Sequence, residues 1–154
     1  MATETSIIYG YGTKISNSKK ISEFIDKHKE SILELRNKTK NDIYIDIINF
    51  VSEIKDHEKA YKTFEYYEAL STCIEGLNGI IADVMAQETG ISFEYRREQD
   101  VDDEYIYFPE CMPWQLSETE KELTESKLDE MIERYLGELE IPYTGEYIKL
   151  EYYG

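Results

Sequence analysis

The stretch TGISFEYRREQDVDDEYIYF at residues 89–108 decides the fold class of this chain. Gly90 suits the left-handed backbone conformation that commonly ends a helix. Residues 91–96 and 105–108 then alternate with a period of two, which indicates two strands. The acidic link 97–104 joins these strands as a long hairpin loop. The stretch therefore predicts the end of a helix followed by an antiparallel pair of strands.

Apolar residues at helical spacing predict further helices on the N-terminal side of this hairpin. They cover about residues 18–36, 43–54 and 80–89, and charged side chains separate the apolar positions in the first of them. Residues 61–70 fit either a helical turn or an extended segment, because their tyrosines and threonine also favour strands. Three helices, and a segment left open between two states, therefore precede the hairpin.

The C-terminal side of the hairpin predicts one more helix and one more strand. Ser117 and Glu120 have the spacing of a capping box, which predicts a helix that ends near Glu140. A restart of this helix at Thr124 is the alternative. Residues 146–152 alternate again after a turn and form the last predicted strand.

The N-terminal residues complete a sheet. Residues 5–15 are rich in β-branched and aromatic side chains, so they predict a strand with Gly10 and Gly12 at a bulge or a close approach. We therefore expect residues 1–154 to form a single acidic α+β domain. Its mostly antiparallel sheet has about four strands, from the N-terminal strand, the central hairpin and the C-terminal strand, packed against three to four helices. Trp114 is expected to anchor a loop over the core.

Charge is distributed unevenly along the chain. The sequence has 33 acidic and 17 basic residues, for a formal charge of −16, and residues 1–60 contribute nothing to it because their charges balance. Residues 98–140 alone carry −12. Such a charge repels nucleic acid and anionic lipid and attracts basic proteins. The expected partner is a basic nucleic-acid-binding protein, with no direct contact to nucleic acid or to a membrane.

Hydropathy and cysteine content predict a cytoplasmic protein. The longest apolar runs are only a few residues long, whereas a membrane-spanning helix needs about 20. The first residues lack the layout of a signal peptide, and two cysteines are too few for a disulfide framework. We therefore expect the chain to reside in the reducing cytoplasm.

Catalytic motifs are absent from the sequence. His28 and His57 lie in charged helical surroundings without a nucleophile motif near either. Cys73 and Cys111 lack the spacing of a zinc site, and both are expected to be buried, as free cysteines usually are. We therefore expect no catalytic residue, metal or cofactor, and interpret the chain as non-enzymatic.

The acidic hairpin loop allows one exception to this interpretation. The loop has four carboxylates that suggest a calcium site: Asp100, Asp102, Asp103 and Glu104. The EF-hand loop requires glycine at the next position, however, and this chain has Tyr105 there. Convergent carboxylates accept a hard cation without that motif, so a weaker divalent-ion site stays open. A small ion-binding enzyme domain that uses this loop is therefore one alternative.

A second acidic feature follows the hairpin. On a continuous helix from residue 118, five carboxylates would form one stripe beside the apolar face. They are Glu118, Glu122, Glu125, Asp129 and Glu133. Like charges at this spacing cost a few tenths of a kcal/mol each, which a cationic partner would offset. The plainer interpretation is a solvated face that keeps the protein soluble.

Tyrosines beside the loop favour a protein-binding surface. The chain has 14 tyrosines, more than a core needs, and tyrosine faces stack on the guanidinium groups that carboxylates also bind. The predicted contact surface consists of Asp100, Asp102, Asp103, Glu104, Tyr105, Tyr107, Glu118, Glu122, Glu125, Asp129 and Glu133. We expect it to occupy the basic nucleic-acid-binding surface of another protein, as phage-encoded DNA mimics and anti-CRISPR inhibitors do. The other alternative is an accessory interaction domain whose acidity serves solubility only.

Overall fold

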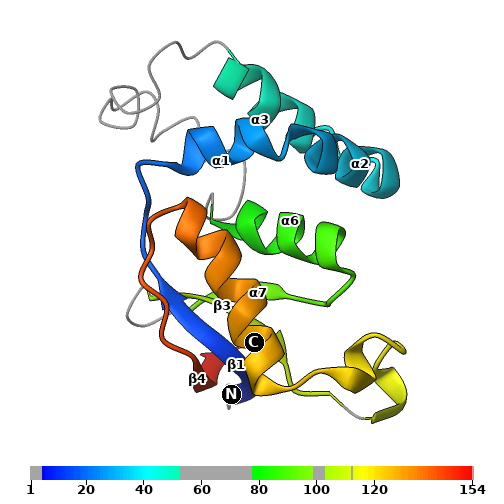
Figure 1. The fold of residues 1–154 in the computed structure, drawn as a ribbon, viewed down its shortest axis with the longest axis vertical. Helices are drawn as coiled ribbons and strands as arrows, with labels where there is room; N and C mark the ends of the chain where they lie inside the picture. The colour runs from blue at the N-terminus through cyan, green and yellow to red at the C-terminus, as the bar shows by residue number, and fades with distance from the viewer. Residues whose placement is uncertain (1–4, 53–77, 99–102, 112, 154) are drawn as a thin grey trace.

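The computed structural model describes residues 5–52, 78–98, 103–111 and 113–153. These residues form one four-stranded sheet and five α-helices, which confirms the α+β class (Figure 1). The strands are β1 (Thr5–Ile15), β2 (Glu94–Arg97), β3 (Glu104–Pro109) and β4 (Glu146–Tyr153). The helices are α1 (Ile21–Lys27), α2 (Lys29–Thr39), α3 (Ile43–Ser52), α6 (Gly79–Thr89) and α7 (Glu125–Glu138). Within these ranges, a helix with the length and apolar character needed to cross a bilayer does not occur.

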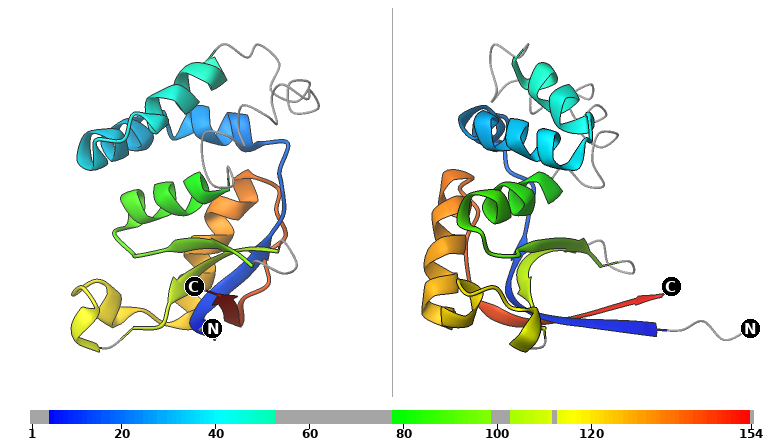
Figure 2. Two further views of the ribbon diagram at one scale, coloured as in Figure 1. Left: turned by 180° about the vertical axis from the view of Figure 1, so that it is seen from behind. Right: turned by 90° about the vertical axis from the view of Figure 1, so that its right-hand side faces the viewer.

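The sheet is antiparallel throughout, with the strand order β2-β3-β1-β4. The N-terminal strand therefore becomes a central strand, flanked by the hairpin on one side and by the C-terminal strand on the other. Its two partners cover different lengths of it. β3 pairs with residues 10–15 of β1, whereas β4 pairs with residues 5–12. Figure 2 shows the resulting two-stranded extension of β1 and β4 beyond the rest of the sheet.

Helices cover one face of this sheet. α6 contacts β2 and α7 contacts β1, while α2 packs on α6, so that α1, α2 and α3 form an outer group of helices (Figure 1). The main core joins the two helix layers to the sheet through fully buried side chains such as Ile25, Ile80, Ile106 and Ile132. The predicted stop of the third helix is confirmed, because Gly90 caps α6 with a φ of 74°.

The opposite face of the sheet carries a second, smaller cluster, in which Tyr107, Ile148 and Leu150 are buried. The Tyr107 ring lies directly over Gly10. A Cβ atom at Gly10 would lie closer than 3.0 Å to this ring, and one at Gly12 would clash with the backbone of β3. The predicted close approach at these two glycines is therefore confirmed.

Two helical predictions need correction. The helix predicted over residues 18–36 is interrupted at His28, between α1 and α2. The capping box of Ser117 and Glu120 forms, with reciprocal bonds of 3.0 and 3.2 Å, but it opens only the single 3-10 turn Glu120–Glu122. Leu123 is then extended, and Thr124 caps α7 by accepting the Lys127 N–H at 3.2 Å. The continuous helix from residue 118 is therefore wrong, and the restart at Thr124 is correct.

The segment after β3 also differs from its prediction. Trp114 lies in the 3-10 turn Pro113–Gln115 and is 79% exposed, so it does not anchor a loop over the core. Cys111 is exposed rather than buried. Both residues follow the end of β3, where the chain leaves the sheet. Cys73, His57 and the ambiguous residues 61–70 lie outside the described residues.

Candidate protein-interaction site

The described part of the acidic loop is bound to the protein's own groups. Asp103 forms an ion pair with Lys14 at 3.0 Å. Glu104 accepts hydrogen bonds from the Asn78 amide, at 3.0 Å, and from the Tyr95 hydroxyl. Glu104 thus joins the hairpin to the residue before α6. Asp100 and Asp102 lie outside the described residues.

The two tyrosines predicted beside this loop both pack against the smaller cluster of the sheet. Tyr107 is fully buried in the smaller cluster, and its hydroxyl donates to Glu94 at 3.3 Å. Burial also raises the pKa of Tyr107. Tyr105 is half-buried against the same cluster, because alternate residues of β3 face the same side of the sheet. The prediction of Tyr107 as a contact residue is therefore wrong.

The predicted carboxylate stripe is divided by the break at Leu123. Glu125, Asp129 and Glu133 share one side of α7 at successive helical turns, whereas Glu118 and Glu122 belong to the preceding segment. The Glu118 side chain is 92% exposed and pairs with Lys121 at 3.0 Å. The five carboxylates therefore lie on two consecutive segments and do not form a single straight row.

Tyrosine hydroxyls occupy two of the α7 carboxylates. Tyr11 on β1 donates to Asp129 Oδ1 at 2.8 Å, and Tyr143 donates to the same oxygen. Tyr147 on β4 donates to Glu125, and its ring meets the Tyr11 ring edge-on at a centroid distance of 5.1 Å. The half-buried Asp129 therefore fastens α7 to the sheet through its Oδ1 atom.

These contacts also shift the ionisation of the tyrosines. The hydrogen bond to Asp129 raises the pKa of Tyr11 to about 12, because ionising the hydroxyl would place two negative charges together. Burial and the same carboxylate raise the pKa of Tyr143. Sequence spacing carries no signal for this cluster, since Tyr11 and Asp129 are 118 residues apart.

Five carboxylates on α7 and on the segment that leads into it are exposed, including Glu125, which also accepts the Tyr147 hydroxyl bond. We call them the α7 acidic surface: Glu118, Glu122, Glu125, Glu130 and Glu133. The cations of this region engage nearby groups. Lys127 donates to the Glu122 carbonyl oxygen at 3.2 Å, and Arg134 stacks over the Tyr135 ring at 4.7 Å while donating to its hydroxyl. In the described residues, Glu130 and Glu133 form no ion pair, so the surface keeps a net negative charge.

Comparison with family models, curated proteins and solved structures finds no match for this chain.

A histidine cluster lies apart from the α7 acidic surface. The mostly buried His28 ring faces Glu88 through Nδ1 at 2.7 Å and Glu138 through Nε2 at 2.9 Å. Each ring nitrogen therefore lies within hydrogen-bonding distance of a carboxylate oxygen. The cluster ties the α1–α2 junction to α6 and α7.

Among the residues that the structure describes, no group of three or more His, Cys, Asp or Glu side chains is arranged to hold a metal ion. Asp103 and Glu104, the two described carboxylates of the acidic loop, already contact Lys14, Asn78 and Tyr95.

Proposed function

We propose that this protein is a non-enzymatic, cytoplasmic binding protein whose α7 acidic surface contacts the basic nucleic-acid-binding surface of a partner protein. The observation that carries the proposal is the exposure of five carboxylates on two consecutive segments whose cations engage local groups. A guanidinium or ammonium group of a partner would offset the repulsion among these carboxylates.

The spacing of the carboxylates limits how closely this surface can resemble the phosphate backbone of DNA. Glu125 and Glu133 are eight residues apart, about 12 Å along a helix at 1.5 Å per residue. Duplex DNA carries one charge per roughly 1.7 Å of its axis, so α7 is a sparser array than a phosphate backbone. The proposed surface therefore acts by electrostatic complementarity, with fast, salt-sensitive association, and not by matching phosphates one for one.

One structural observation favours the accessory-domain alternative. Asp129 and Glu125 bind tyrosine hydroxyls of the same chain, so part of the acidity serves the protein's own packing. In that alternative the remaining carboxylates only maintain solubility, and reversing their charge leaves all interactions unchanged. The two functions are therefore separated by one mutational experiment.

The test compares two charge-matched double variants. Glu130→Lys with Glu133→Lys alters the α7 acidic surface, and Asp26→Lys with Glu30→Lys makes the same charge change on α1 and α2, where both residues are also exposed. Each protein is used to capture partners from nuclease-treated lysate of the source cell, at two salt concentrations. A captured protein is then purified and its nucleic-acid binding is titrated with the wild type.

The proposal expects the α7 variant to lose about tenfold in affinity, ~1.4 kcal/mol, while the control variant keeps it. Wild-type protein should displace nucleic acid from the partner with saturation near one equivalent, and higher salt should weaken the complex. Equal binding by both variants, or a partner that still binds nucleic acid when saturated, would contradict the proposal.

A further inference from the structure

The N-terminal half of β1 has an open edge. On the β3 side, the last backbone bond runs from the Glu110 N–H to the Tyr9 carbonyl at 2.9 Å. Backbone groups of alternate residues face the same edge of an antiparallel strand, so those of Ile7 also point to this side. β3 pairs with β1 only from Gly10 onward. Among the described residues, no strand therefore pairs with Ile7 at this edge.

The sequence of this half-strand lacks the usual protection of a sheet edge. Natural edge strands carry charges, prolines or bulges that prevent pairing with another chain. Residues 5–9 read TSIIY, with neither a charge nor a proline. Ile7 is 44% exposed and Tyr9 is 49% exposed. An uncharged, apolar open edge of this kind is suited to receive another strand.

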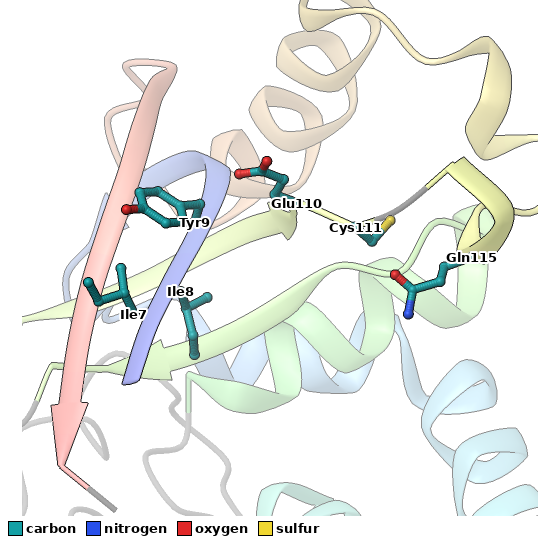
Figure 3. Close-up of a pocket in the computed structure, with 6 residues that line it drawn as sticks. All are labelled: Ile7, Ile8, Tyr9, Glu110, Cys111 and Gln115. Carbon is teal, nitrogen blue, oxygen red and sulfur yellow. The ribbon is translucent and has the colours of Figure 1, made fainter. Parts of the chain in front are cut away.

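Two hollows lie along the same edge. One, of about 600 Å³, is lined by Ile7, Ile8, Tyr9, Glu110, Cys111 and Gln115 (Figure 3). The other, of about 430 Å³, shares Tyr9, Glu110 and Cys111 and continues to the more apolar Tyr11, Phe108, Leu116 and Tyr147. A strand that paired with Ile7 would project alternate side chains to the two faces of the sheet. The hollows therefore provide room for side chains beside the open edge.

Charge indicates the chemistry of the occupant. The described lining includes the carboxylate of Glu110, which is exposed, and no lysine or arginine. A second copy of this chain would bring another formal charge of −16 to the contact, which opposes self-association. The apolar side chains of a partner strand would fill the hollows, and a lysine or arginine on the same strand would pair with the Glu110 carboxylate.

We propose that the open edge of β1, centred on Ile7, binds an extended segment of another protein as an added β-strand, with alternating apolar and basic side chains. In this mode of recognition the backbone bonds supply affinity, and the pockets for alternate side chains supply specificity. The lining of the two hollows includes none of the five carboxylates of the α7 acidic surface, and the proposal does not depend on the function proposed for that surface.

Hydrogen exchange on the wild-type protein tests the proposal without any mutation. The probe is a short, capped peptide of alternating valine and lysine, and a peptide of alternating valine and glutamate is its charge control. The Ile7 amide should exchange quickly in the unbound protein and about tenfold more slowly with the lysine peptide. The Ile8 amide faces β4 and should not change. No added protection at Ile7 at saturating peptide, or equal protection by both peptides, would overturn the proposal.

Two variants test the backbone contact itself. Ile7→Pro removes the N–H at the open edge and leaves the pairing with β4 intact, whereas Ile7→Thr changes the side chain but keeps the N–H. Ile7→Pro should bind the lysine peptide about tenfold more weakly than Ile7→Thr, which changes the same side chain but keeps the N–H. Binding by Ile7→Pro at wild-type affinity would overturn the proposal.

Two further measurements identify the occupant and separate this proposal from the function proposed above. A wild-type dimer in light scattering that Ile7→Pro abolishes would assign the edge to a second copy and would overturn the peptide proposal. The double variant Glu130→Lys with Glu133→Lys should bind the lysine peptide within about twofold of the wild type. Loss of peptide binding in that variant would place the peptide on α7 and also overturn the proposal.

Discussion

Asp129 on α7 accepts a hydrogen bond from the hydroxyl of Tyr11 on β1 at 2.8 Å. This bond joins two residues that are 118 positions apart in the sequence. The Tyr143 hydroxyl donates to the same carboxylate oxygen. Helical spacing alone assigns Asp129 to a stripe that faces a partner. In the structure, Asp129 holds α7 against the sheet. Its neighbour Glu133, one turn further along α7, stays exposed. Stability and binding should therefore depend on different carboxylates of the same helix.

Removal of the Asp129 carboxylate should destabilise the fold. Asp129→Ala leaves the Tyr11 and Tyr143 hydroxyls without their acceptor, and hydrogen bonds to charged groups contribute about 1.5–3 kcal/mol each in favourable cases. Because Asp129 is only half-buried, we expect a loss of about 1–3 kcal/mol in the free energy of unfolding, measured by urea denaturation. The matched change Glu133→Ala should stay within about 0.5 kcal/mol. Equal losses in the two variants would contradict this role of Asp129.

Alkaline pH should weaken the same contact. The pKa of Tyr11 is raised by Asp129 from an ordinary value of 10.0 to about 12 in the folded protein. The folded state therefore holds the hydroxyl proton more tightly than the unfolded state. Its contribution to stability is complete below pH 10 and is lost as the pH rises toward 12.

The experiment compares urea midpoints of the wild type and of Tyr11→Phe across this range. Tyr11→Phe should be less stable at neutral pH and should show a smaller decrease above pH 10. A parallel decrease in both proteins would show that Tyr11 is not responsible.

Acid should weaken the contact between Glu138 and the α1–α2 junction. Burial alone raises the pKa of Glu138, but hydrogen bonds from Lys27 and His28 outweigh it and hold the pKa below its ordinary value of 4.5. The carboxylate therefore contributes stability above pH 4.5, and this contribution is lost as the pH falls through the lower pKa of the folded state.

Glu138→Gln should accordingly destabilise the protein at neutral pH and much less in acid. Thermal unfolding at neutral pH and at about pH 3 measures the difference. Glu118→Gln is the control, because the exposed pair of Glu118 and Lys121 should contribute at most about 1 kcal/mol. A Glu138→Gln effect of the same size at both pH values would contradict the prediction.

Two glycines should respond to alanine in opposite directions. At Gly12 a Cβ atom would overlap the Ile106 carbonyl and the Tyr107 backbone, so Gly12→Ala should force β1 and β3 apart at a cost of about 1–3 kcal/mol or more. Gly137 lies in α7 with open space around its Cβ position, so Gly137→Ala should stabilise the protein by about 0.5–1 kcal/mol. Urea denaturation of both variants checks the signs, and destabilisation by Gly137→Ala would contradict this prediction.

Local patterns in the sequence determined the elements of this fold. The period-two residues of the hairpin, the helix stop at Gly90 and the capping box of Ser117 and Glu120 all appear in the structure. The close approach at Gly10 and Gly12 was also predictable. Each of these signals depends on backbone geometry within a few residues, so each can be recognised without knowing how the chain packs.

Only the tertiary structure decided which side chains meet. It buries Tyr107, engages Asp129 with tyrosines and places His28 between Glu88 and Glu138. It exposes Trp114 and, among the described residues, leaves Ile7 of β1 without a paired strand on the β3 side. These outcomes depend on strand register and on packing between segments that are distant in the sequence. The periodicity of one segment indicates which face it buries, but the residue that it contacts there is set by the position of another segment.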